Sequence, residues 1–308
     1  MKRFFRILLL LICLLLAGIA LLFVSHKSLY FGKEAGTDSL TVLSYNTHRM
    51  GGFAKPDENE VIAYLRSSDA DILCLQEVEV YKSHKYLTWK ELRRALKDYP
   101  YHYCDFKIDN KRRQYGNVVF SKYPLTNTAT VGFDSRGNIS SQCDVIVRKD
   151  TFRLFVNHLE SNRLEQNDLD SVIQTHSLSH GRLIGKLQSA RRLRHEQARE
   201  IHSRVKASPY PVIVVGDFND IPLSLTYLTL RPGLKDCFLR TSNLRIGNTL
   251  VWHSSSASAG KTSHSRSWNF LGIRIDYILC SPFFVPVSFR TDHPSGSDHY
   301  PVVSTLTW

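Results

Sequence analysis

Short apolar runs that each end in polar or acidic residues recur along this chain, and this pattern constrains the fold more than any other feature. Leu40 to Tyr45 reads LTVLSY, Asp71 to Leu75 reads DILCL, and Pro211 to Val215 reads PVIVV. Runs of this length between polar residues are typical of buried strands. Further strands are predicted at residues 101–106, 117–120, 144–148, 152–156, 273–279 and 301–306.

Helical patterns alternate with these strands. Residues 58–67 place Val61, Ile62 and Leu65 on one face, and residues 87–96 and 183–205 also read as helices. Many short strands with a few helices predict a layered α/β domain. The sequence has no internal repeat and no linker between domains after residue 38, so we expect one domain over residues 39–308.

The first residues predict a membrane segment. Ile7 to Val24 is an unbroken apolar run that would reach about 27 Å as a helix, enough to span a bilayer core. Lys2, Arg3 and Arg6 precede it, which places the amino terminus in the cytoplasm and the rest outside. Residues 1–24 are therefore predicted to be a single-pass anchor and residues 25–38 a linker. The alternative is a signal peptide cleaved near Ala20, which would give a secreted protein.

The net charge of +12 fits a partner that carries phosphates, either nucleic acid or anionic lipid. A basic surface that only aids solubility fits it equally well. The sequence indicates no protein partner, and a monomer is the default expectation.

Residues able to do chemistry gather at the ends of the predicted strands. Side chains from distant segments converge in one cleft where strand ends open at the edge of a sheet. A single aspartate at a strand end is more often a turn or helix cap, but six such segments are harder to explain in that way. They contain Asn46, Glu77, His158, Asp217 with Asn219, Asp276, and Asp298 with His299.

The chemistry of this set is that of phosphate-ester hydrolysis. Carboxylate and amide oxygens suit Mg²⁺ or Mn²⁺, which bind through a few carboxylates together with substrate phosphates and waters. His158 and His299 can move protons or polarise a phosphoryl oxygen. A metal, a carboxylate that activates water and two imidazoles together predict hydrolysis of a phosphoester.

The same segments, in the same order, resemble the endonuclease/exonuclease/phosphatase (DNase I-like) superfamily, which includes deoxyribonuclease I, abasic-site endonucleases, neutral sphingomyelinases and inositol-polyphosphate 5-phosphatases. The resemblance covers about residues 40–308 and implies a four-layer α/β sandwich of two mixed sheets with helices outside. It rests on SYN at 44–46, LQE at 75–77, GNVVFSKYP at 116–124, NHLES at 157–161, GDFN at 216–219, RIDYIL at 274–279 and SDHYP at 297–301.

The resemblance also implies roles. Glu77 would be the main metal ligand, with Asn46 beside it and Asp298 as a further carboxylate. The number of metals, one or two, stays open.

The proton-transfer roles are implied in the same way. Asp217 would orient or deprotonate the attacking water, and Asn219 would hold the phosphate. His299 would contact the scissile phosphate, Asp276 would fix its tautomer, and His158 would stabilise developing charge or protonate the leaving oxygen. Whether Asp217 or His299 is the general base stays open.

Three residues are candidates for substrate binding: Asn117, Arg266 and Trp268. Trp268 could stack on a nucleobase or could anchor its loop.

We therefore expect a divalent-metal-dependent phosphodiesterase, of nuclease type, in which an activated water attacks phosphorus in line. The alternative is a phosphodiesterase or phosphatase acting on lipid headgroups, which the membrane segment favours. Pro282 to Pro286, PFFVP, is the one candidate for an apolar lipid contact. A binding module without activity is disfavoured because every acid and histidine of the motifs is present.

Overall fold

The computed structural model describes residues 36–52, 55–133, 135, 137–162, 181–241, 247–250 and 273–308. The chain divides between Gly36 and Thr37, and all described strands and helices belong to the second part. The predicted membrane segment at 1–24, Arg266 and Trp268 lie outside the described residues. No helix in the described ranges is long and apolar enough to cross a bilayer.

Two six-stranded sheets form the described domain. The first has the order β11-β12-β1-β2-β4-β3 and the second β5-β6-β7-β8-β10-β9. The strands of the first sheet are β1 Ser39–Asn46, β2 Ile72–Tyr81, β3 Tyr101–Asp109, β4 Arg113–Ser121, β11 Val285–Thr291 and β12 Val302–Thr307. Those of the second are β5 Leu125–Val131, β6 Ile139–Val147, β7 Asp150–His158, β8 Val212–Asp217, β9 Lys235–Asp236 and β10 Asp276–Cys280.

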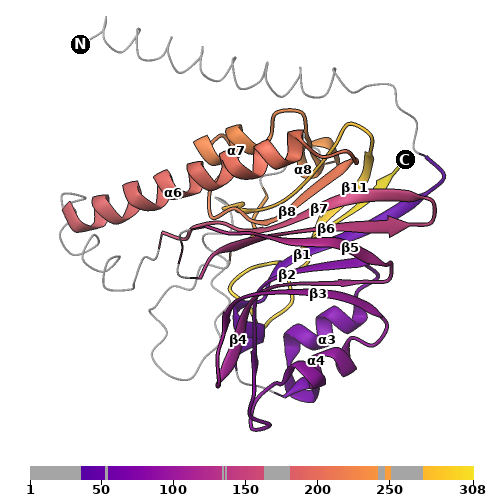
Figure 1. Ribbon diagram of the computed structural model, residues 1–308, viewed down its shortest axis with the longest axis vertical. Helices are drawn as coiled ribbons and strands as arrows, with labels where there is room; N and C mark the ends of the chain where they lie inside the picture. The colour runs from indigo at the N-terminus through magenta and orange to yellow at the C-terminus, as the bar shows by residue number, and fades with distance from the viewer. Residues whose placement is uncertain are drawn as a thin grey trace, which may run out of the picture. The chain divides into compact units, whose positions relative to one another are not determined.

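Helices cover the outer faces of the two sheets, as Figure 1 shows. On the side of the first sheet lie α3 and α4, and on the side of the second lie α6 and α7. The predicted four-layer sandwich is therefore confirmed. The helical segments are α2 His48–Gly51, η1 Pro56–Glu58, α3 Glu60–Ser67, α4 Trp89–Ala95, α6 Gly181–Lys206, α7 Leu225–Leu230 and α8 Cys237–Thr241.

Apolar side chains from both sheets fill the space between them. Val42, Cys74 and Val119 of the first sheet belong to one buried cluster with Leu154 and Ile213 of the second. The alternate residues of the same strands pack outward beneath the helices. Central strands that are buried on both faces must be apolar at nearly every position. This is why the sequence predicted these strands.

Local signals explain where the predicted helices begin. The side chain of Asn59 accepts a hydrogen bond from Ile62 N and caps α3. Thr88 and Glu91 form a capping box at the start of α4. The helix predicted at 183–205 is α6.

The sequence did not predict β5, β9, β11 or the short helices α2, α7 and α8. The strand β5 reads LTNTATV, with exposed polar residues at its centre, because it is an edge strand of its sheet. Pro286 of β11 also lies in an edge strand, where proline is tolerated.

The candidate lipid contact at 282–286 is wrong for most of its length. Phe284 is fully buried and packs edge-on against Phe152 and Trp308. Val285 and Pro286 are also buried, whereas Pro282 and Phe283 are exposed. The apolar character of this segment therefore serves the core.

Candidate active site

Strand register brings the predicted residues to one end of the sandwich. β7 and β8 are parallel and place His158 beside Asp217. The antiparallel pairing of β8 with β10 places Asp276 opposite Asp217. In the other sheet, β1 and β2 are parallel and align Asn46 with Gln76, next to Glu77.

Asp217 lies at the centre of the site and is almost fully buried. Its Oδ2 accepts hydrogen bonds from Asn46 Nδ2 at 3.0 Å and from Asn219 Nδ2 at 3.2 Å. Its Oδ1 accepts from the backbone N–H of Asn219 at 2.8 Å. The carboxylate is thus held by donors from both sheets.

The residue before Asp217 has to be glycine. Gly216 has a φ of 129°, and a Cβ there would lie 1.9 Å from the carbonyl oxygen of Asn157. The close approach of β7 and β8 at this point sets the position of Asp217 relative to His158.

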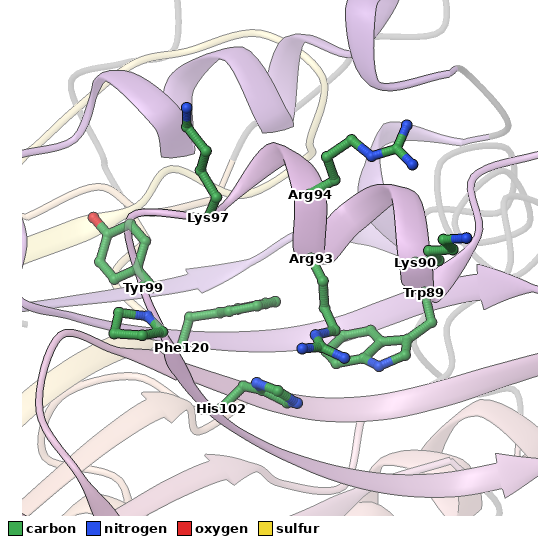
Figure 2. Close-up of a pocket in the computed structure, with 9 residues that line it drawn as sticks. Trp89, Lys90, Arg93, Arg94, Lys97, Tyr99, His102 and Phe120 are labelled. Atoms are coloured by element: carbon green, nitrogen blue, oxygen red, sulfur yellow. The ribbon is translucent and has the colours of Figure 1, made fainter.

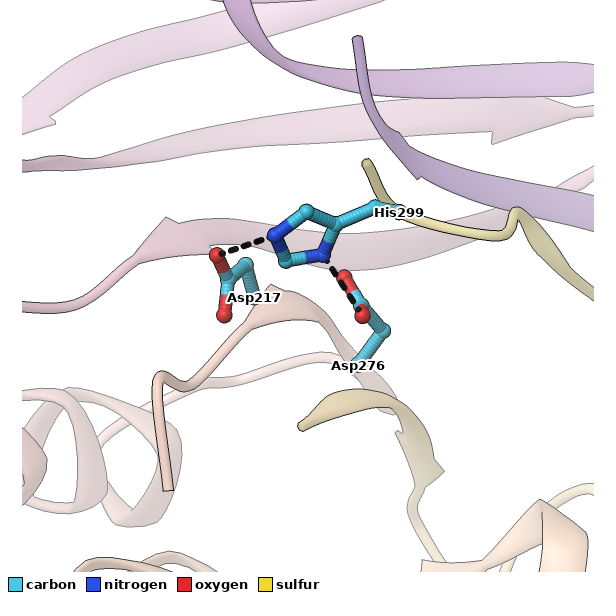
Figure 3. A group of neighbouring side chains, drawn as sticks. All are labelled: Asp217, Asp276 and His299. Atoms are coloured by element: carbon cyan, nitrogen blue, oxygen red, sulfur yellow. Dashed lines mark hydrogen bonds and ion pairs between the residues drawn. The ribbon is translucent and has the colours of Figure 1, made fainter. Parts of the chain in front are cut away.

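His299 bridges two carboxylates (Figure 3). Its Nδ1 lies 3.0 Å from Asp276 Oδ2, and its Nε2 lies 3.8 Å from Asp217 Oδ2. All three side chains are buried. The Asp276 contact orients the ring so that Nε2 faces Asp217 at the centre of the site.

Burial and charge shift both acid–base groups. Burial is the largest effect on Asp217 and, against the opposing charge of His299, raises the pKa of its carboxyl group to about 6. For His299, burial works to lower the pKa, but the carboxylates of Asp276 and Asp217 outweigh it and raise the pKa to about 10. At neutral pH the site therefore holds an ionised Asp217 and a protonated His299.

Glu77 sits in a β-bulge, where the register of β2 against β4 shifts between Leu75 and Val78. Its backbone is left-handed, with a φ of 54°. The bulge turns the carboxylate toward the site, where Oε1 accepts from Asn46 Nδ2 at 3.1 Å and lies 3.5 Å from His158 Nε2. His158 Nε2 also lies 3.9 Å from Asp217 Oδ2.

Asp298 lies slightly apart from this group and pairs with His48. The distance from His48 Nδ1 to Asp298 Oδ1 is 3.0 Å. Burial raises the pKa of Asp298, but the hydrogen bond from His48 and the charges of His299 and His48 lower it more. The sequence analysis missed His48, although the two glycines that follow at 51 and 52 signalled an unusual turn after β1.

The donor set fits a hard divalent cation. Asp217, Asp276 and His299 have atoms within 4.8 Å of one another, the two carboxylates offer oxygens to a cation, and Glu77 adds a carboxylate whose side chain is 20% exposed. Asp276 Oδ1 is buried without a hydrogen-bond partner among the described residues. Asn46 contributes an oxygen only if its amide turns, because Nδ2 faces the carboxylates and Oδ1 accepts from His48 N.

Asn117 lies behind the site and is buried. Its Nδ2 donates to the carbonyl oxygens of Ile139 and Val156 and to Ser141 Oγ. These bonds join β4 to β6 and β7 of the other sheet. Its predicted role in substrate binding stays a prediction.

Among the cavities lined by residues that the structure describes, one borders the site and another lies apart from it. A cavity of about 400 Å³ opens beside Glu77 and His158. A cavity of about 450 Å³ lies under α4, between Trp89, His102 and Phe120 (Figure 2). The second holds none of the predicted catalytic residues, so the first is the candidate substrate cleft.

The model of the Endonuclease/Exonuclease/phosphatase family matches residues 43–299, from β1 to His299. The chain belongs to this family. Its members are phosphoesterases and generally use divalent metal ions. The cluster of carboxylates described above agrees with both properties.

Solved structures of this family share the fold. An endonuclease/exonuclease/phosphatase from Beutenbergia cavernae DSM 12333 has a TM-score of 0.62 at 19% identity, covering 87% of this chain and 71% of its own. Truncated Caenorhabditis elegans TDP2 has a TM-score of 0.60 at 16% identity, covering 89% and 100%. A family protein from Bacteroides thetaiotaomicron has a TM-score of 0.59 at 17% identity, covering 89% and 97%. No curated protein matches the sequence.

Proposed function

We propose that this family member is a divalent-metal-dependent phosphodiesterase of nuclease type, in which an activated water attacks phosphorus in line. The observation that carries the proposal is the position of Asp217. Its buried carboxylate is held by Asn46 and Asn219 and lies within 4 Å of both imidazoles. A water beside it would face a phosphate held by the same residues.

The charges at neutral pH favour Asp217 as the general base. The raised pKa of His299 keeps its ring protonated, so Nε2–H donates to a phosphoryl oxygen and cannot accept the proton of the water. Asp217 is ionised above a pKa of about 6 and can accept it. Asn219 Nδ2 adds a neutral donor beside the same position.

His158 is the candidate for the leaving oxygen. Its Nε2 faces Glu77 and Asp217 at 3.5 Å and 3.9 Å, from the β7 side of the cleft. A proton on that nitrogen would neutralise charge on the leaving group.

Mg²⁺ or Mn²⁺ would be held by Glu77, with Asn46 and Asp298 as the other predicted ligands. When bound, the ion supplies positive charge that stabilises the phosphoryl oxygens in the transition state.

The experiment uses the full chain in mild detergent, with Mg²⁺ or with EDTA, beside an Asp217→Asn variant. The substrates are plasmid DNA, single-stranded DNA, 5′-phosphotyrosyl DNA, sphingomyelin and phosphoinositides. We expect metal-dependent DNA cleavage that falls about 10²–10⁴-fold in the variant, since general-base catalysis contributes this much. A variant that folds and retains the wild-type rate would refute the mechanism.

One observation favours the alternative, a lipid-headgroup hydrolase. Ile221 and Leu223 are 52% and 49% exposed and follow the GDFN motif within four residues, and Leu228 of α7 is 48% exposed. Apolar side chains beside an active site can enter a lipid surface. Cleavage of sphingomyelin or phosphoinositides without cleavage of DNA in the same panel would select this alternative.

We also propose that residues 1–24 anchor the protein in a membrane, with the amino terminus in the cytoplasm and residues 39–308 outside. The apolar run and the preceding basic residues support this arrangement. Protease added to intact cells whose outer membrane has been permeabilised should digest the domain, so that the domain is lost from the membrane fraction. Complete protection of the domain would contradict the placement.

A further inference from the structure

The cleft beside Glu77 has two arginines in its wall that the catalytic scheme does not use. Arg49 comes from the turn after β1, and Arg113 from the start of β4. Neither belongs to a motif that the sequence analysis identified. The remaining lining residues are Glu77, Ile108, Tyr115, Gly137, Asn138, His158 and Ser161.

A buried carboxylate holds both arginines. Glu79 has a side chain only 2% exposed, and its Oε1 accepts a hydrogen bond from Arg113 Nη1. Its Oε2 lies 4.0 Å from Arg49 Nε. A buried carboxylate is costly unless it is paired, so the hydrogen bond to Glu79 fixes the guanidinium of Arg113, and the longer ion pair attracts that of Arg49 to the same place. These two positive charges and one negative charge give the Arg49–Arg113–Glu79 group a net positive charge, next to Glu77, which is the carboxylate in the lining of the cleft.

The backbone also aims Arg49 at the cleft. His48, Arg49 and Met50 have φ values of 42°, 59° and 58°, a left-handed run that costs free energy in residues other than glycine. Met50 is fully buried, and Met50 N donates to Thr47 Oγ1. Anchors on both sides of Arg49, His48 with Asp298 and Met50 in the core, maintain this strained turn.

We propose that Arg49 and Arg113, positioned by Glu79, bind a second phosphate group of the substrate, next to the phosphate that is cleaved. This inference rests on the proposed function, which places the scissile phosphate at Asp217 and His299. Neither of those residues lines this cleft, whereas Glu77 and His158 border both regions. Guanidinium groups bind phosphate through paired N–H donors, and ordered arginines do so with good geometry.

The ligand is therefore a phosphoester with at least two neighbouring phosphates. A nucleic-acid strand has this chemistry at every step, and a polyphosphorylated inositol headgroup has it as well. Sphingomyelin, with a single phosphate, would leave Arg49 and Arg113 without a ligand.

The experiment compares the full chain with Arg113→Gln on matched substrates. One is a thymidine dinucleotide with a single internal phosphate, and the others carry an added phosphate at the 5′ or the 3′ end. We expect the wild type to prefer one of the two-phosphate substrates and Arg113→Gln to reduce that preference in kcat/KM at least tenfold, mainly through KM. Arg112→Gln, an exposed neighbour outside the cleft, is the matched control and should keep the preference.

A second variant and a second measurement distinguish loss of the phosphate subsite from loss of folding. Glu79→Gln should lose the same preference if it acts by positioning the arginines, and a melting curve shows whether the variant is folded. Binding of a labelled single-stranded oligonucleotide in EDTA should show a salt slope smaller by about one in Arg113→Gln. An unchanged preference and an unchanged slope in folded variants would overturn the subsite.

The two proposals fail in different ways. If the wild type hydrolyses no phosphoester but its oligonucleotide binding depends on Arg113, the proposed function fails and the subsite stands. If hydrolysis is present and indifferent to the second phosphate, the subsite fails alone. A preference for inositol bisphosphate over the dinucleotides, lost in Arg113→Gln, would support the subsite and name the headgroup as its source.

Discussion

At the scale of single residues, the site works because identical side chains are placed in different surroundings. Asp217 and Asp276 are both buried aspartates beside His299. Asp276 makes the 3.0 Å contact to Nδ1 and acts on the ring, whereas Asp217 faces Nε2 across 3.8 Å and borders the space for substrate. The place of each aspartate relative to the ring, and not its residue type, therefore sets what it can do in the site.

The pH dependence of the reaction should show both groups. In the free enzyme, kcat/KM should rise through a pKa of about 6 as Asp217 ionises and fall through a pKa of about 10 as His299 loses its proton. In Asp276→Asn the ring loses the largest interaction that raises its pKa, so the alkaline limb should move toward neutral pH by about one unit or more. The measurement is a pH–rate profile beside the exposed control Asp57→Asn, and an alkaline limb that stays in place would contradict the assignment.

At the scale of elements, irregular backbone turns side chains toward the site that a regular strand would direct elsewhere. A regular β2 would carry Glu77 on an alternating face, but the bulge and its φ of 54° turn the carboxylate into the site. On the other side of the site, Arg194 of α6 donates to Glu160 O at 2.8 Å and to Asn162 Oδ1 at 2.9 Å. This buried arginine ties the helix to the loop that follows His158.

The point at which β8 lies closest to β7 should tolerate no side chain at position 216. Gly216→Ala would place Cβ 1.9 Å from Asn157 O at a φ of 129°, so we expect a loss of about 4 kcal/mol or more in the free energy of unfolding. Gly233→Ala is the matched control, with a φ of 80° and no heavy atom within 4 Å of the added Cβ, and should cost about 1 kcal/mol. Urea denaturation of both variants checks this, and equal losses would show that the backbone conformation alone decides the cost.

At the scale of the whole molecule, the geometry of the candidate site depends on the two sheets keeping their relative position. Asn46 and Glu77 come from one sheet, and His158, Asp217 and Asp276 from the other. The Asn46 bond to Asp217 therefore crosses between the sheets, as do those of Asn117 to Ile139 and Val156. The site exists only when both sheets are packed together.

Asn117 provides a test of this dependence. In Asn117→Leu the carbonyl oxygens of Ile139 and Val156 lose their buried donor, and we expect a loss of about 2–4 kcal/mol in the free energy of unfolding. KM should stay near the wild-type value at temperatures where the variant is folded. A rise in KM without loss of stability would instead support the substrate-binding role predicted from the sequence.

Much of the fold, and the strand ends that form the candidate site, could be predicted from the sequence. Buried strands such as β8 are apolar on both faces, helices such as α3 carry one apolar face, and both patterns are local. The residues that follow the central strands, such as Asp217 and His158, could be assigned to one cleft because strand ends at one edge of a sheet must meet. The edge strand β5 was missed because its central residues are polar and exposed to water, so that its sequence does not alternate between apolar and polar residues.

What the sequence determined, then, is which residues form the layers and which functional groups stand at the strand ends, since both follow from burial and from strand geometry. Only the tertiary structure decided the roles of Glu79, Arg49 and Arg113, because their pairing joins a turn after β1 to two strands and depends on a left-handed backbone. It also separated Asp276 from Asp217 and moved Phe284 into the core. Distances between segments far apart in the chain set these outcomes, and charge interactions and burial depend on those distances.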